Sequence, residues 1–414
     1  MRSAELGDSS VDAHVRELLD LIARWIHLIA GIMWVGNSML FNWLDRNLVK
    51  RAGAARGERH VGEIWMVHSG GFYQVEKLYL APSEMPAMLH WFKWQSYTTW
   101  MSGIALLVLV YYMGGAAILV DPAVQSMSPE RATLTGLGVV FGGLAVYDLL
   151  WRSPLAKHER ALTALTLGLF AALVYWLTTV FSGRGAYIHV GALLGTCMAG
   201  NVFLHITPSQ RELVAATIAG REQDPALSWR AKQRSIQNNY MTFPLLFIML
   251  SSHFSSTYGH AHRALVLGVL MVIGASVRHV LNIRFTFPAW KPTLAAVLTA
   301  GVAALAFLLV PFGNAERDAA AALSSGPKVS FSAARTIVQE RCVHCHSATP
   351  KDTVFTTPPN GVVFDSPEQI RLYADRIMAR AVTAKNMPLA NRTGMTDEER
   401  QTLGRWIAQG AKVD

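Results

Sequence analysis

The 414-residue sequence predicts an all-α fold in which a polytopic bundle of about eight membrane-spanning helices precedes a small soluble helical domain. Hydrophobic residues make up 51% of the chain and charged residues only 16%, below the roughly one quarter found in ordinary soluble domains. The apolar residues gather in runs long enough to cross a bilayer, and the composition becomes soluble from Ser330 onward.

Eight apolar runs are the candidate spans of the bundle. The first follows a polar segment, residues 1–18, and is too long to be the hydrophobic core of a cleavable signal peptide. Each run approaches the roughly 20 apolar residues that a helix needs to cross a bilayer. The runs lie near residues 20–44, 96–118, 133–151, 161–182, 187–206, 240–258, 263–283 and 291–312.

The segment 61–94, between the first two spans, has a different character. It is rich in apolar and aromatic residues but also carries charged side chains. We therefore expect an amphipathic helix or a re-entrant structure at the membrane interface. The charged residues are Glu63, Glu76, Lys77, Glu84 and Lys93.

Arginine and lysine residues alternate between the loops. They are frequent after spans one, three and five, at 46–59, 152–160 and 211–234, and sparse in the intervening loops. Because cytosolic loops carry an excess of these residues, both termini are expected to face outward. In a bacterial inner membrane, the residues after the last span would then lie in the periplasm. The net charge of +9 is expected to face anionic membrane lipid and not nucleic acid.

The chain after the last span divides into a linker and a domain. Residues 314–328 are rich in Ala, Ser and Gly, which is typical of a linker. They are expected to join a membrane domain, 1–313, to a soluble domain, 329–414.

The soluble domain is expected to contain three helices. The first two are predicted over 332–341 and 366–382. The third begins after Thr396, which forms a capping box with Glu399. Its apolar face, by helical spacing, consists of Leu403, Trp406 and Ile407.

Residues 342–346 have the sequence Cys-Val-His-Cys-His, the C-x-x-C-H pattern that attaches a c-type haem. Cys342 and Cys345 would form thioethers to the haem, and His346 would ligate the iron. A zinc site would need further Cys or His ligands, and the sequence has none after His346. The motif and the three helices together match the size and plan of a class I cytochrome c domain.

Haem iron in such a domain needs a ligand on its second face, and a methionine thioether would raise the potential. Met387 precedes a proline on a loop between two predicted helices, where the chain can fold over the haem, so it is the predicted ligand. Met395 is the second choice, and Met378 is expected to lie in the core of its helix.

Five histidines fall within the apolar runs, where ionisable groups are costly and are functional candidates by default. By the topology above, His27, His189 and His253 lie toward the outer side. His205 and His279 lie toward the cytosol. The alternative for each is a histidine that only hydrogen-bonds between helices or lies at the interface.

Polar residues gather in three places on the predicted cytosolic side. Asn238 and Asn239 belong to the run Arg-Ser-Ile-Gln-Asn-Asn-Tyr at 234–240. His279 belongs to a second cluster at the end of span seven, and His68 to a third in segment 61–94. Such groups suit a planar, polar, anionic ligand, although helix caps and lipid-headgroup contacts would also explain each cluster. The convergence of all three on one membrane face favours a binding site there.

These features together resemble the bacterial membrane-bound, cytochrome c-linked urate oxidases, also called urate hydroxylases. The resemblance covers nearly the whole chain, including the order of eight spans and then a C-x-x-C-H domain with Met-Pro. It is carried by Arg-Trp-Ile-His at 24–27, Trp-Val-Gly-Asn-Ser at 34–38, Leu-His-Trp-Phe-Lys-Trp-Gln at 89–95 and Gln-Asn-Asn-Tyr-Met-Thr-Phe-Pro at 237–244.

The resemblance implies oxidation of urate to 5-hydroxyisourate in purine degradation, with water supplying the hydroxyl group and no hydrogen peroxide formed. Electrons would leave through haem c toward a respiratory acceptor, either a soluble cytochrome or a terminal oxidase. Because urate loses two electrons and one haem c accepts one, we also expect at least one haem b, held by His27 with His189 or His253. A His or Glu of the cytosolic clusters would act as the base. The candidate catalytic residues are Asn238, Asn239, His279 and His68.

Two other functions fit parts of the sequence. A respiratory quinol-oxidising cytochrome would use the same interfacial Trp, Tyr and His residues for a quinone. A simple membrane anchor for the cytochrome domain would need only one span, so eight spans disfavour it. Reduction of the haem by urate, or by a quinol instead, would distinguish a urate oxidase from a quinol-oxidising cytochrome.

Overall fold

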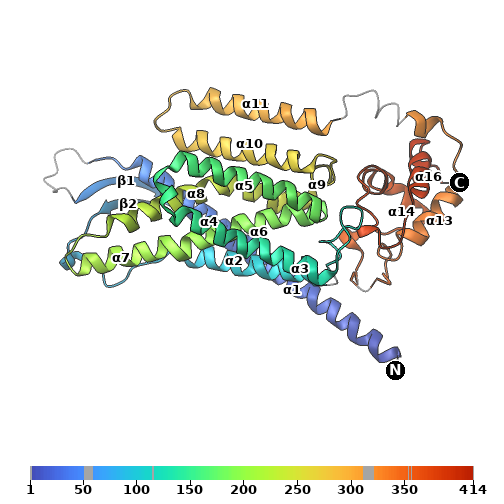
Figure 1. Ribbon diagram of the computed structural model, residues 1–414, viewed down its shortest axis with the longest axis horizontal. Helices are drawn as coiled ribbons and strands as arrows, with labels where there is room; N and C mark the ends of the chain where they lie inside the picture. Colours follow the sequence, from blue (N-terminus) through green and yellow to red (C-terminus); the bar gives the residue numbers. More distant parts are fainter. Residues whose placement is uncertain are drawn as a thin grey trace.

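The computed structural model describes residues 2–50, 59–113, 116–310, 321–352, 354–355 and 357–413, with side chains from residue 15 onward. Figure 1 shows a helical bundle with a small helical domain at one end and a β-hairpin at the other. The bundle helices are α1 (Arg2–Asn47), α2 (Trp94–Leu106), α3 (Pro129–Leu137), α4 (Gly143–Arg152), α5 (Glu159–Val180), α6 (Gly183–Asn201), α7 (Thr207–Ile218), α8 (Pro225–Leu250), α9 (Ser255–Tyr258), α10 (Arg263–Ile283) and α11 (Trp290–Leu309).

Three short π-helical segments belong to the bundle. One extends α2, and the other two each connect two consecutive helices. They are η2 (Leu107–Tyr112), η3 (Gly138–Gly142) and η5 (Val202–Ile206). Because η3 joins α3 to α4, and η5 joins α6 to α7, each pair forms one long helical rod.

Six helical rods among the described residues are long and apolar enough to cross a membrane. The other two predicted spans are helical as well. The predicted span 96–118 corresponds to α2 with η2, and 240–258 corresponds to α8, which begins at Pro225 and carries its polar residues in its first half. The six rods are Val15–Asn47, Pro129–Arg152, Glu159–Val180, Gly183–Ile218, Arg263–Ile283 and Trp290–Leu309.

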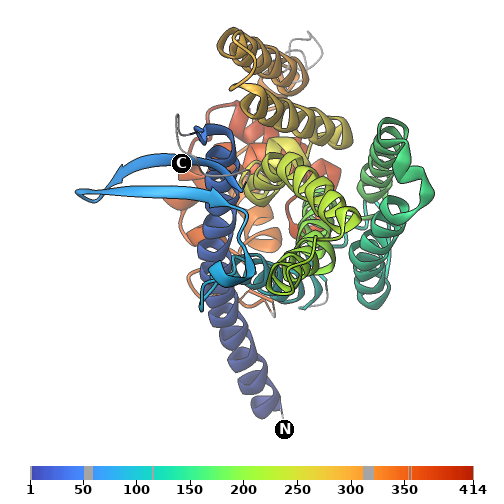
Figure 2. The same cartoon turned by 90° about the vertical axis from the view of Figure 1, so that its left-hand side faces the viewer.

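The expectation of an amphipathic helix in 61–94 is wrong. Residues 60–78 form a β-hairpin, and between it and α2 lies only the short 3₁₀ helix η1 (Pro82–Glu84). Strands β1 (His60–His68) and β2 (Gly71–Leu78) pair antiparallel and project from the bundle (Figure 2). Their tight turn places Ser69 and Gly70 at φ 49° and 77°, the left-handed conformation of a two-residue hairpin turn. Successive side chains along β1 and β2 point to opposite faces of the hairpin, whereas a helix places residues three or four positions apart on one face.

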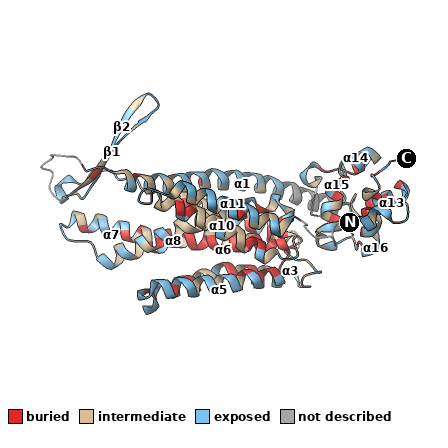
Figure 3. Cartoon of the chain, turned by 90° about the horizontal axis from the view of Figure 1, so that it is seen from above, coloured by how far each residue is buried: buried red, intermediate tan, exposed pale blue. Residues whose placement is uncertain are grey.

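Helix α6 is the centre of the bundle. In the most apolar stretch of Gly183–Ile218, 67% of residues are buried, against 6% in α1 and in α11. Figure 3 shows buried residues concentrated along α6 and exposed ones along α1. The exposed residues of α1 and α11 are largely apolar, among them Leu21, Trp25 and Phe307, as expected for helices that face lipid.

The C-terminal domain contains α13 (Phe331–Arg341), α14 (Pro367–Leu372), α15 (Ala374–Ile377) and α16 (Asp397–Ala408). The capping box of Thr396 and Glu399 opens α16, as predicted. The helix predicted over 366–382 is instead interrupted at Tyr373, whose ψ of 14° departs from helical geometry, and it continues as the π-helical segment η8 (Met378–Thr383). Leu403 and Trp406, on the predicted apolar face of α16, are buried in the core of this domain.

The predicted linker 314–328 lies partly outside the described residues, and its residues 321–325 are helical. The domain that follows contacts the bundle end opposite the hairpin (Figure 1). Thr357 Oγ1 donates a hydrogen bond to Glu17 Oε1 on α1 at 3.1 Å. Beyond α9, a Cβ atom added at Gly259 would lie 3.2 Å from Ala384 Cβ, so the two parts touch there as well.

Candidate functional site

Asp148 on α4 is the centre of a polar network inside the bundle. Its Oδ1 lies 2.5 Å from His205 Nε2 and accepts a hydrogen bond from Arg234 Nη2 at 2.8 Å. Its Oδ2 lies 2.7 Å from Arg152 Nε. His205 and Arg234 are buried, with 5% and 1% of their surface exposed, so these contacts tie η5 and α8 to α4 away from solvent.

Amide and hydroxyl groups extend this network. Tyr147 donates a hydrogen bond from its hydroxyl to Gln237 Oε1, and its ring lies 4.8 Å from the Arg234 guanidinium carbon. Asn201 Nδ2 donates to the Tyr147 hydroxyl and to Asn238 Oδ1, at 2.8 Å each. Asn238 Nδ2 donates in turn to a backbone carbonyl of α6, at 3.0 Å. Asn238, a predicted site residue, therefore belongs to the network.

The network carries an excess of positive charge. Arg152 and Arg234 are charged at any physiological pH, and both pair with the single carboxylate of Asp148. With neutral His205 the sum is one net positive charge. Arg234 is buried and paired with Asp148, so the excess charge lies at Arg152, whose side chain is 47% exposed. An anion bound beside Arg152 would balance this charge.

The backbone explains why His205 reaches Asp148. Pro208 lies at the start of α7 and has no N–H to donate to the carbonyl four residues earlier. The rod accommodates it with the π-helical segment η5, which contains His205. Such π segments occur often at functional sites because they redirect a side chain from the regular helical surface.

A second polar group joins α8 to α10. Asn239 Oδ1 accepts hydrogen bonds from Arg278 Nε at 2.8 Å and Asn282 Nδ2 at 2.7 Å. The Tyr240 hydroxyl lies 2.8 Å from His279 Nδ1, and the two rings stack. Two of the three predicted polar clusters, those at 234–240 and 278–284, therefore do converge.

His68, the remaining predicted catalytic residue, lies elsewhere. It pairs with Gly71 next to the hairpin turn and is exposed. The hydrogen bonds of Asn238, Asn239 and His279 described above go to other residues. The hairpin belongs to the same end of the molecule as α7 (Figure 1), but its tip projects away from the bundle.

The haem-attachment motif lies between α13 and α14. His346 Nδ1 lies 3.0 Å from the Val362 carbonyl oxygen, so Nδ1–H can donate to it and Nε2 is left for a metal. Burial lowers the pKa of His346, which favours the neutral, ligating imidazole. Cys342, which follows α13, packs against the domain core. The donor set and the orientation of His346 fit a covalently attached haem c.

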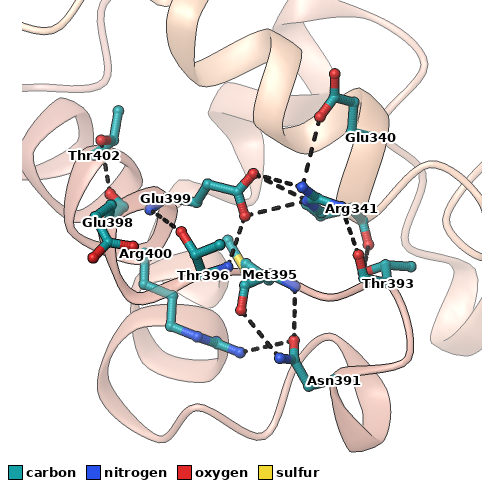
Figure 4. Close-up of polar contacts among 10 residues, drawn as sticks. All are labelled: Glu340, Arg341, Asn391, Thr393, Met395, Thr396, Glu398, Glu399, Arg400 and Thr402. Atoms are coloured by element: carbon teal, nitrogen blue, oxygen red, sulfur yellow. Dashed lines mark hydrogen bonds and ion pairs between the residues drawn. The ribbon is translucent and has the colours of Figure 1, made fainter.

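The two candidate methionine ligands differ in their surroundings. Met395 is 3% exposed, and its backbone is held at both N–H and C=O by the Asn391 side chain (Figure 4). Arg400 Nη2 donates to that same Asn391 side chain at 3.3 Å. Met387 is only partly buried and packs at the edge of the core cluster that Cys342 also contacts. This position fits an axial ligand better than the enclosed position of Met395.

The three membrane histidines predicted to hold haem b have different surroundings. His27 Nδ1 lies 2.8 Å from Thr99 O on α2. His189 is fully buried, with Nδ1 2.7 Å from Gly185 O and Nε2 2.9 Å from the Tyr112 hydroxyl, so neither nitrogen is open to a metal. His253 is exposed in the short 3₁₀ helix that follows α8 (Ser251–His253). Haem b and its ligands remain a prediction.

Three residues of the Asp148 network were not singled out from the sequence as site residues: Asp148, Tyr147 and Asn201. The available signal was the presence of Asp148 and Asn201 within apolar runs that otherwise carry few polar groups. Charged and amide side chains at membrane depth nearly always have partners and a role. Only the packing of α4 against α6 and α8 identifies those partners.

One protein family matches the chain. Its model, described as urate oxidase N-terminal, matches residues 13–310, which is the whole bundle with the hairpin. No curated protein matches the sequence, and no solved structure does.

Proposed function

The chain belongs to the urate oxidase N-terminal family, and we propose that it is a membrane-bound oxidoreductase that converts urate to 5-hydroxyisourate. The balanced half-reaction is urate plus water giving 5-hydroxyisourate, two protons and two electrons. The family match carries this proposal, and the excess positive charge at Arg152, beside Asp148, supports it, because urate is an anion at neutral pH.

The Asp148 network offers the groups that the reaction needs. His205 can donate Nε2–H to the Asp148 carboxylate, which leaves Nδ1 as a proton acceptor. We propose that His205 takes up a proton released from urate or from the attacking water, and that Asp148 orients the ring and stabilises its charged form. Arg234 holds the same carboxylate and adds positive charge. The amide groups of Asn201 and Asn238 fix the geometry of the helices around this pair.

The C-terminal domain supplies the electron exit in this proposal. Cys342, Cys345, His346 and Met387 would hold haem c. When bound, it would supply one-electron transfer to a respiratory acceptor. The polar network and the hairpin belong to the cytosolic half by the charge of the loops, and the C-terminal domain lies at the other end (Figure 1). No hydrogen peroxide forms in this scheme, because oxygen is not the acceptor.

An anaerobic reduction experiment tests the proposal. The oxidised full-length protein is mixed with urate, or with a short-chain quinol, and the haem absorption is followed. We expect urate to reduce the haem and the quinol to leave it oxidised. The His205→Gln variant should reduce at least a hundredfold more slowly with urate while keeping the same haem spectrum and the same reduction by dithionite. Reduction by quinol and not by urate would instead establish a quinol-oxidising cytochrome.

A further inference from the structure

A surface cavity of about 420 Å³ lies where the end of α4, the turn before α5 and the start of α8 meet. Its volume is within the range of small-molecule sites, about 300–1,000 Å³. The turn is the short 3₁₀ helix η4 (Pro154–Lys157). The side chains that define its chemistry are Trp151, Arg152, Lys157, Glu159, Trp229 and Arg230.

These side chains match a planar anion. Three of them are cationic, and only Glu159 is acidic, so the lining is net positive. Glu159 is also engaged by Gln233 Nε2 at 3.3 Å. Two indole rings offer flat surfaces on which a heterocycle can stack.

Arg152 connects this cavity to the Asp148 network. It lines the cavity and also contacts Asp148 Oδ2 at 2.7 Å. Asn238 and Asn239, in contrast, use their side-chain oxygens and the Asn238 amide group in hydrogen bonds between helices. The side chains of the two predicted asparagines therefore hold helices together. The donors available to a ligand are those that line the cavity, among them Lys157 and Arg230.

We propose that this cavity is where the anionic purine first docks on the cytosolic side, stacked on Trp229 or Trp151 and neutralised by Arg230 and Arg152. From there it would reach the buried His205, which does not line the cavity. The inference rests on the proposed function for the identity of the purine. It adds a location and names Trp229 and Arg230 as residues that bind the substrate. The charge of Arg230 would select the urate anion over a neutral purine of the same shape.

The test separates binding from turnover. The full-length protein is reduced with ascorbate under anaerobic conditions, so that urate can bind but cannot pass on electrons. Binding of radiolabelled urate is then measured by equilibrium dialysis, for the wild type and for Arg230→Gln and Trp229→Leu. We expect the dissociation constant to rise about tenfold or more in each variant, and KM to rise while kcat changes little. Arg160→Gln, at an exposed position of α5 outside the cavity, is the matched control and should bind as the wild type does.

Two further comparisons make each outcome decisive. Neutral hypoxanthine should bind weakly and be unaffected by Arg230→Gln. Unchanged urate affinity in both variants, with the wild type active on urate, would overturn the docking site and leave the proposed function intact. Urate binding without haem reduction in the wild type would overturn the proposed function and leave the docking site intact. In nanodiscs, loss of phosphatidylglycerol binding alone in the variants would identify the cavity as a lipid-headgroup site and overturn the inference.

Discussion

Asp148 and His205, 57 residues apart in the chain, meet inside the bundle with Oδ1 and Nε2 separated by 2.5 Å. The same carboxylate also holds Arg234 and Arg152. One acidic side chain thus connects two helical rods and α8, and it lies between the surface cavity and the buried amide groups. Four predictions follow from this and other contacts.

Replacing Asp148 by Asn should destabilise the bundle strongly. The variant leaves Arg234 buried without its counter-charge, which costs about 3–5 kcal/mol in comparable buried pairs. The measurement is the free energy of unfolding of the purified protein in denaturant. Asp45→Asn is the control, because its pair with Lys77 is exposed at both side chains and should contribute at most about 1 kcal/mol. Equal stabilities of the two variants would contradict the role of Asp148.

Replacing Met387 should change the axial ligation of the haem without affecting its attachment. Met387→Ala should keep the covalent haem, because Cys342 and Cys345 remain, but lose the low-spin spectrum of His/Met ligation. Absorption and magnetic circular dichroism spectra check this. The companion variant Met395→Leu should keep the low-spin spectrum, since Met395 is enclosed in the core. The opposite pattern would make Met395 the ligand.

The stability of the C-terminal domain should fall in acid through Glu399. Partial burial acts to raise the pKa of Glu399, but hydrogen bonds from the Arg341 guanidinium and the Thr396 backbone outweigh it and hold the pKa below its usual value. A lowered folded-state pKa adds stability above the unfolded value of about 4.3, and this stability disappears as the pH falls through the folded-state pKa.

Denaturant unfolding of the full chain, followed at the haem band between pH 3 and pH 7, measures this effect. Glu399→Gln should lose about 1.5–3 kcal/mol near pH 7, typical of hydrogen bonds to a charged group, and approach the wild type in acid. Its exposed neighbour serves as control, and Glu398→Gln should change stability little. A constant difference between Glu399→Gln and the wild type across the pH range would argue against the ion pair.

Gly136 should tolerate no side chain. A Cβ atom there would lie 2.5 Å from His189 Nε2 and 2.6 Å from the Tyr112 hydroxyl, so Gly136→Ala must separate these two groups. Overpacking of this kind typically costs about 1–3 kcal/mol. Gly138→Ala, in the same rod, meets nothing within 4 Å and should be neutral or slightly stabilising. Comparable thermal unfolding of the two variants would show that the packing around His189 is loose.

Local patterns predicted much of the fold. The apolar runs predicted the helices, because a segment in lipid must satisfy its backbone hydrogen bonds internally, and a helix does so within a single run. The capping box at Thr396 gave the start of α16, because a cap involves only residues three positions apart. The hairpin at 60–78 was not predicted, because its strands lack a clear alternation of polar and apolar residues, and only the Ser-Gly turn between them indicates a hairpin.

The sequence by itself determined which structural elements and chemical groups this protein has. These are apolar helices, a C-x-x-C-H motif, and asparagines, arginines and histidines predicted near one membrane face. Those signals are local, since they depend on residue type and short spacing. The tertiary structure decided which groups are paired. It joined Asp148 to His205 and Arg234, placed Arg152 between them and a cavity, and left His68 next to the hairpin turn. Such pairings depend on how α4, α6 and α8 pack, because contacts between residues far apart in the chain arise only when whole helix faces fit together.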